Sequence, residues 1–126
     1  MKLATMLGHR FSVISVGSRA MPIKEELIRS YGLEKYAGKI QTSGKTLTGC
    51  DDKEAFLAAA KRAVEEDNAE VIVLGCAGLC GLDDFLAEET GVPVLDGVSC
   101  ALAVASGLVR MRTGISKACR YAQNVG

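Results

Sequence analysis

The stretch EVIVLGCAGLCG, residues Glu70–Gly81, decides the fold of this chain. It opens with four consecutive apolar residues, Val71–Leu74, and the run breaks at Gly75. A short run that is apolar at every position is typical of a strand buried on both faces of a parallel sheet. A Gly-Cys-Ala-Gly turn follows, and a helical pattern begins near Leu82. The stretch therefore predicts a strand, a turn and a helix, which is the repeating unit of an α/β fold.

The turn after this strand carries a thiol at the place where α/β proteins bind their ligands. In open parallel sheets the binding crevice lies at the carboxyl ends of the strands, and Cys76 is at that end. The glycines around it, Gly75 and Gly78, let backbone N–H groups approach a ligand. Position alone leaves two interpretations open, a reactive thiol or a small buried residue in a tight turn.

Length and composition are typical of one ordinary globular domain, residues 1–126. The chain is 48 % hydrophobic and 24 % charged, which excludes a disordered protein. Its 15 basic and 15 acidic residues are balanced and form no basic block, so we expect no nucleic-acid partner. No apolar run approaches the roughly 20 residues of a membrane helix, and the first residues do not form a signal peptide. The five cysteines match no zinc pattern, so we predict no metal site and a cytoplasmic protein with reduced thiols.

Further strands and helices alternate along the chain. Other strands are predicted at Phe11–Val16, Lys39–Ser43 and Val92–Leu95. One helix begins near Pro22, ends at Gly32 and has an apolar side made of Ile23, Leu27, Ile28 and Tyr31. A second is introduced by a capping box of Asp51 and Glu54, and the last spans Val98–Arg112.

This alternation predicts a three-layer α/β sandwich around a four-stranded parallel sheet, a flavodoxin-like lobe with the strand order 2-1-3-4. The carboxyl ends of strands 1, 3 and 4 then meet, which brings residues 15–18, 76–78 and 96–97 together. Asp96 either contacts a ligand or caps the last helix. Arg19 either holds a carboxylate or lies in solvent, and His9 is expected on the surface.

These residues together resemble one known family. EVIVLGCAGL, followed by GVPVLDGV and an Ala-rich helix that ends near RTGISK, is similar to the C-terminal half of hydantoin racemases, in the aspartate/glutamate racemase superfamily. The segments RFSVIS and PIKEELIRSYGLE occur in the same order as in that family. The resemblance covers nearly the whole chain. It implies a racemase or epimerase that needs no cofactor and acts on a small hydantoin or amino-acid-type substrate.

The resemblance also implies a mechanism and its residues. One cysteine from each of two lobes faces the α-carbon of the substrate. One thiolate removes the α-proton, the other thiol returns a proton to the opposite face, and nearby donors stabilise the enolate. Cys76 matches the catalytic cysteine of the second lobe, and Ser15 matches a hydroxyl residue that contacts the substrate. The turn residues that would bind the substrate are Gly75, Ala77 and Gly78.

Compared with the family, the site is incomplete. The first lobe, with its own thiol, has no counterpart in this sequence, and Val16 stands where a threonine is common. Cys80 follows one turn after Cys76 on the same element, so it cannot reach the opposite face of a substrate. The family implies no role for the other cysteines, Cys50, Cys100 and Cys119.

Three hypotheses follow from this incomplete site. The chain is a racemase lobe, part of a site shared between chains, or a non-catalytic domain that binds a small molecule or completes another chain. The last helix carries an apolar face, Ala101, Leu102, Ala105, Leu108 and Val109, which either folds back on the sheet or packs on another copy. We favour the second arrangement and expect a homo-oligomer, most simply a dimer.

Overall fold

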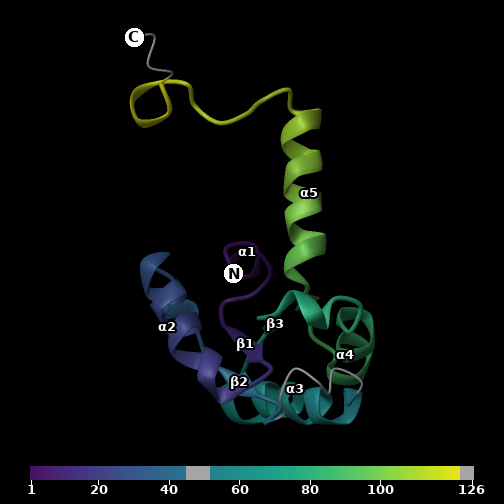
Figure 1. Cartoon of the computed structure of the whole chain (residues 1–126). Coiled ribbons are helices and arrows are strands. Elements are labelled where there is room, and N and C mark those ends of the chain that lie inside the picture. The colour runs from purple at the N-terminus through teal and green to yellow at the C-terminus, as the bar shows by residue number, and fades with distance from the viewer. Residues whose placement is uncertain (45–51, 123–126) are drawn as a thin grey trace.

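The computed structural model describes residues 1–44 and 52–122. They form a four-stranded, all-parallel sheet with helices on both sides (Figure 1). The strands are β1 (Phe11–Ser15), β2 (Gln41–Thr42), β3 (Val71–Leu74) and β4 (Val94–Leu95). Their order is β2-β1-β3-β4, which confirms the predicted topology.

Five α-helices accompany the strands within the described ranges: α1 (Ala4–Leu7), α2 (Met21–Ser30), α3 (Lys53–Asp67), α4 (Asp83–Thr90) and α5 (Gly97–Arg110). The 3₁₀ turns there are η1 (Ser18–Ala20), η2 (Glu34–Tyr36), η4 (Ala77–Leu79) and η5 (Cys119–Tyr121). None of these described helices is long and apolar enough to cross a membrane.

The core lies on both faces of β1 and β3. On one face Ile14 and Ile72 pack with Phe56 of α3 and Leu86 of α4. The residues of the opposite cluster, on the side of α1 and α2, are Ala4, Phe11, Val13, Ile28, Leu33, Ile40, Val71 and Val73. Every residue of β3 is buried because both faces of the strand are covered, which is the physical reason for its unbroken apolar run.

Several predicted details differ from the structure. The edge strand β2 is shorter than the predicted Lys39–Ser43. In α2, Ile28 is buried, but Ile23 and Tyr31 remain exposed, so the predicted apolar side is only partly in the core. The predicted cap Asp51 lies outside the described residues. The N-cap of α3 is Asp52, whose side chain accepts a hydrogen bond from the N–H of Ala55 at 3.1 Å. The capping residue therefore lies one position after the predicted Asp51, and the predicted capping box of Asp51 with Glu54 is wrong.

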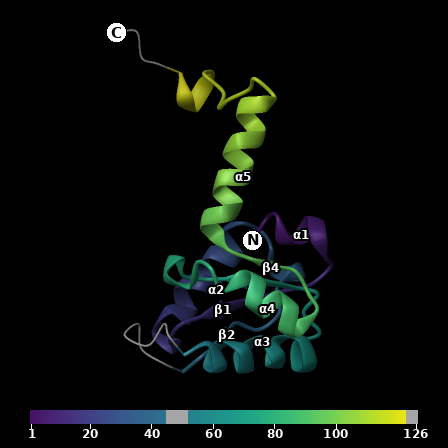
Figure 2. The same ribbon diagram turned by 90° about the vertical axis from the view of Figure 1, so that its right-hand side faces the viewer.

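Helix α5 leaves the sheet and stands away from the rest of the molecule (Figures 1 and 2). All of its residues belong to the described part of the chain, and none of them is buried. Leu102 is 67 % exposed and Val109 is 76 % exposed. The helix begins one residue earlier than predicted, at Gly97, and does not fold back on its own sheet.

Candidate functional site

Directly after β3, at Gly75, the chain passes very close to β1. The N–H of Gly75 donates to the carbonyl of Ile14 at 2.8 Å. A Cβ at this position would lie 2.9 Å from the Ile14 oxygen and 3.0 Å from a methyl of Val13. A side chain at position 75 would therefore collide with β1, so glycine is required for packing, independently of any ligand.

Cys76 follows in an extended conformation, with φ −140° and ψ 135°, and is half-buried. Its carbonyl accepts from the N–H of Leu79 at 3.0 Å and so closes the 3₁₀ turn η4. The α-helix α4 begins only at Asp83. This agrees with the helical pattern predicted from about Leu82. The element directly after Cys76 is a single 3₁₀ turn, which carries much less dipole than a full helix.

Cys76 lines a cavity of about 560 Å³ between the carboxyl end of β3, one side of α2 and the base of α5. This volume lies in the range of about 300–1,000 Å³ that is usual for small-molecule sites. The side chains around it are mostly apolar. The lining residues are Met1, Lys24, Leu27, Tyr31, Val73, Leu74, Gly75, Cys76, Ala77, Gly97, Val98, Ala101 and Leu102.

The structure brings together some of the predicted site residues. Gly75, Cys76 and Ala77 line the cavity, whereas Gly78 and Ser15 do not. Ser15 is only 2 % exposed, and its hydroxyl donates to the carbonyl of Gly17 at 3.3 Å. The substrate contact assigned to Ser15 by resemblance stays a prediction.

The contribution of α2 to this cavity was not predicted from the sequence. Lys24, Leu27 and Tyr31 all line it. They are spaced by three and four residues, which places them on one face of a helix. That spacing is visible in the sequence, but only the tertiary structure shows that this face borders Cys76.

Asp96 is a buried helix cap. It is 2 % exposed and accepts hydrogen bonds from the N–H groups of Val98 and Ser99 at 3.1 and 2.9 Å, and from the Ser99 hydroxyl at 2.8 Å. The bonds from Ser99, followed by that from Val98, hold the pKa of Asp96 below its ordinary value although burial acts in the opposite direction. Of the two interpretations of Asp96, the cap is confirmed.

The same carboxylate reaches the turn that carries Cys76. The thiol of Cys80, at the end of η4, donates to Asp96 at 3.5 Å. This hydrogen bond and the nearby negative charge raise the pKa of Cys80. Cys80 is exposed and is not among the described residues that line the Cys76 cavity.

The remaining predicted residues within the described ranges do not line the Cys76 cavity. Cys100 lines a separate cavity of about 350 Å³ beside α1. Cys119 is exposed, as are Arg19 and His9, and Cys50 lies outside the described residues. Within residues 1–44 and 52–122, no cluster of three His, Cys, Asp or Glu side chains is placed to hold a metal ion.

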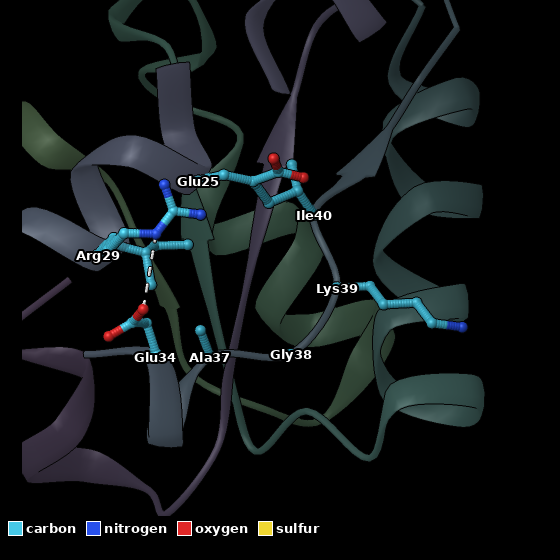
Figure 3. Close-up of a pocket in the computed structure, with 8 residues that line it drawn as sticks. Glu25, Arg29, Glu34, Ala37, Gly38, Lys39 and Ile40 are labelled. Carbon is cyan, nitrogen blue, oxygen red and sulfur yellow. Dashed lines mark ion pairs between the residues drawn. The ribbon is translucent and has the colours of Figure 1, made fainter. Parts of the chain in front are cut away.

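Figure 3 shows a third hollow, of about 230 Å³, between α2 and the segment that leads into β2. Arg29 points across it toward Glu34, and their charged groups are 3.7 Å apart. Lys39 is drawn pointing away from the hollow. Arg29 and Glu34 thus pair with each other, Lys39 pairs with Asp67 outside the hollow at 3.9 Å, and the lining includes no thiol. The Cys76 cavity is therefore the better candidate for chemistry.

Comparison with known proteins gives consistent matches. Residues 1–105 match the model of the family described as Asp/Glu/Hydantoin racemase. The chain is 42 % identical to a hydantoin racemase from Pseudomonas sp. (strain NS671), over 94 % of this chain and 50 % of that protein. It is 36 % identical to a hydantoin racemase from Rhizobium meliloti, over 96 % of this chain and 52 % of that protein.

Solved structures give the same result. An allantoin racemase from Pseudomonas fluorescens is 36 % identical, with a TM-score of 0.88 over 99 % of this chain and 55 % of its own. An allantoin racemase from Klebsiella pneumoniae is 31 % identical, with a TM-score of 0.86 over 92 % of this chain and 49 % of its own. The chain spans about half the length of these relatives. By the family match over residues 1–105, the chain belongs to the Asp/Glu/Hydantoin racemase family.

Proposed function

We propose that this chain forms one lobe of a cofactor-independent racemase or epimerase that acts at the α-carbon of a hydantoin or amino-acid-type substrate. The observation that carries the proposal is the position of Cys76 at the carboxyl end of β3, on a cavity of about 560 Å³. Family membership supports racemase chemistry. The similarity to hydantoin and allantoin racemases favours cyclic ureide substrates.

In the proposed reaction the thiolate of Cys76 removes the α-proton. The C–H bond breaks, an S–H bond forms, and the electron pair of the C–H bond moves onto the adjacent carbonyl oxygen as an enolate. The backbone N–H group of Ala77, which lines the cavity, would donate to that oxygen. Return of the proton from the thiol to the same face restores the starting enantiomer.

Inversion needs a second proton donor on the opposite face. Of the described residues that line the cavity, Cys76 is the one cysteine, and no His, Asp or Glu is among them. The other side chains there with a transferable proton are Lys24 and Tyr31, on the side of α2. We propose that the second group comes from another lobe or another chain. This chain alone should therefore exchange the α-proton and show little or no racemisation.

The test is deuterium exchange in heavy water with each enantiomer of a 5-alkyl hydantoin, followed by NMR and chiral chromatography. We expect deuterium incorporation above the protein-free rate, with retention of configuration, and loss of that excess in Cys76→Ser. Cys80→Ser is the matched control, since it changes the thiol at the other end of the same turn and should keep the exchange. An unchanged exchange rate in Cys76→Ser would reject the proposal.

Two other results would point to the alternatives. Ligand-induced thermal stabilisation without any exchange would support a domain that binds a small molecule but does not react with it. Interconversion of enantiomers at ordinary enzyme rates by this chain alone would show that two copies build a complete site between them.

A further inference from the structure

The cavity beside Cys76 contains one positively charged side chain that the proposed reaction has not yet used. Among the described lining residues, Lys24 of α2 is the one lysine or arginine side chain. It is half-buried. The ion pairs found within residues 1–44 and 52–122 join Arg29 to Glu34 and Lys39 to Asp67, and neither involves Lys24.

Lys24 is held close to the turn that bears the thiol. Its Cε atom would lie 3.3 Å from a Cβ on Gly75, the residue directly before Cys76. The lysine stem therefore packs over the bare backbone of Gly75, and the absence of a side chain there leaves room for it. The ammonium group and the thiol border the same space from two elements, α2 and the end of β3.

An ammonium group beside a mostly apolar cavity attracts a negative charge more strongly than one in bulk water. Apolar walls lower the effective dielectric, so a charge interaction over a few Å is weakened less. Charge-assisted hydrogen bonds to an oxygen are also stronger than neutral ones. Leu27, Val98 and Leu102 supply such walls around the space that Lys24 borders.

We propose that Lys24 makes this cavity select ligands with a negatively charged oxygen, and that it holds the oxygen that gains charge when Cys76 removes the α-proton. The substrate class is then a small molecule with a carboxylate or an ionisable ureide next to the reacting carbon. The second part of the proposal rests on the proposed function. The charge selectivity does not, because it can be measured whether or not the chain catalyses exchange.

The test compares two alkylating reagents of almost equal size, anionic iodoacetate and neutral iodoacetamide. In both reactions the thiolate displaces iodide from carbon, so the ratio of the two rates cancels the fraction of thiolate present. Rates at Cys76 are measured by peptide mass spectrometry. We expect Lys24→Met to lower the iodoacetate-to-iodoacetamide ratio at Cys76 by about three- to tenfold, and Lys24→Arg to keep it.

Lys35→Met is the matched control, because Lys35 is an exposed lysine that does not line the cavity. It should leave the ratio at Cys76 unchanged. An unchanged ratio in a folded Lys24→Met variant would overturn the proposal. If that variant does not fold, the iodoacetate-to-iodoacetamide ratio of the wild type is measured at increasing salt concentration. The ratio should fall as salt rises from about 0.05 to about 0.5 M, because salt screens the charge of Lys24. A ratio that does not change with salt overturns the proposal.

The two proposals fail separately. A ratio that depends on Lys24, without deuterium exchange on hydantoins, would support the anion site and reject the reaction. If deuterium exchange depends on Cys76 but the iodoacetate-to-iodoacetamide ratio is the same in the wild type and in Lys24→Met, the proposed reaction stands and the role of Lys24 is rejected.

Discussion

Cys76 and Cys80 stand at the two ends of one 3₁₀ turn, but their surroundings differ. Cys76 borders the cavity, with Lys24 on the same lining. The thiol of Cys80 donates a hydrogen bond to Asp96. This bond and the negative charge of Asp96 raise the pKa of Cys80. Since the thiolate is the nucleophile, exposure alone does not make Cys80 reactive.

We therefore predict that iodoacetamide labels Cys76 faster than Cys80 at neutral pH, although Cys80 is the more exposed of the two. Asp96→Asn should accelerate labelling of Cys80, because it removes the negative charge that disfavours the thiolate. Time-resolved peptide mass spectrometry measures both rates, with exposed Cys119 as the internal reference. Faster labelling of Cys80 than of Cys76 in the wild-type chain would contradict the prediction.

Gly75 is the second decisive residue, because β1 leaves no room for a side chain. We predict that Gly75→Ala lowers the free energy of unfolding by about 1–3 kcal/mol, since its Cβ would lie 2.9 Å from the Ile14 carbonyl oxygen. Urea denaturation followed by circular dichroism measures the change.

Gly107→Ala is the control for that experiment. Position 107 lies inside α5 with no atom within 4 Å of an added Cβ. Alanine there should leave stability unchanged or raise it by up to about 1 kcal/mol through helix propensity. Equal changes in the free energy of unfolding for Gly75→Ala and Gly107→Ala would show that the contact with β1 does not restrict the size of the residue at position 75.

At the scale of elements, Asp96 joins β4 to α5 and ties both to η4 through Cys80. Its hydrogen bonds lower its pKa in the folded chain. A carboxylate with a depressed folded pKa stabilises the protein above its unfolded pKa of about 4. That stabilisation is lost as the pH falls from there through the folded pKa.

We predict that Asp96→Asn lowers the free energy of unfolding at pH 7 by about 1 kcal/mol, because the hydrogen bonds from Ser99 to a charged carboxylate are stronger than those to a neutral amide oxygen. The variant should also lose less stability than the wild type on acidification below about pH 5. Unfolding measured at intervals from neutral to acidic pH tests both expectations. Asp84→Asn is a control, because Asp84 is an exposed acidic residue of α4, a helix without a side-chain cap hydrogen bond. If the free energies of unfolding of the wild type and of Asp96→Asn change with pH in the same way, Asp96 does not stabilise the fold through its lowered pKa.

At the scale of the whole molecule, α5 is the feature without a covering layer. It is apolar on nearly every side, and a helix of that kind is normally buried. Large apolar side chains of α1 are exposed as well, with Met6 at 78 %. Burial of one Leu or Val side chain is worth about 1.5–3 kcal/mol, so we propose that a second copy of the chain covers this surface.

We predict that light scattering at low micromolar concentration shows a dimer, the commonest closed assembly. Leu108→Asp should shift the dimer toward monomer, because it places a charge on the exposed face of α5. Ile23→Asp is the control, since Ile23 is an exposed apolar residue of α2 rather than α5. A wild-type monomer, or a dimer equally weakened by both changes, would exclude an interface built on α5.

Much of the fold follows from local patterns in the sequence. The apolar run Val71–Leu74 specified a strand covered on both faces, and alternation of strands with helices specified a parallel sheet of order β2-β1-β3-β4. These features depend on residues close together in sequence, together with the right-handed connections that all such folds share. The position of Cys76 just after the carboxyl end of β3 followed in the same way.

Only the tertiary structure decided which groups surround that thiol. Lys24 packs over Gly75, beside Cys76. Asp96 accepts a hydrogen bond from the thiol of Cys80, at the other end of the turn. No periodic pattern in the sequence encodes contacts between residues so far apart in the chain. The structure also turned the hydroxyl of Ser15 toward Gly17 and left α5 standing away from the sheet. The physical reason is that periodicity determines which face of an element is apolar, whereas contacts between distant side chains depend on how whole elements pack.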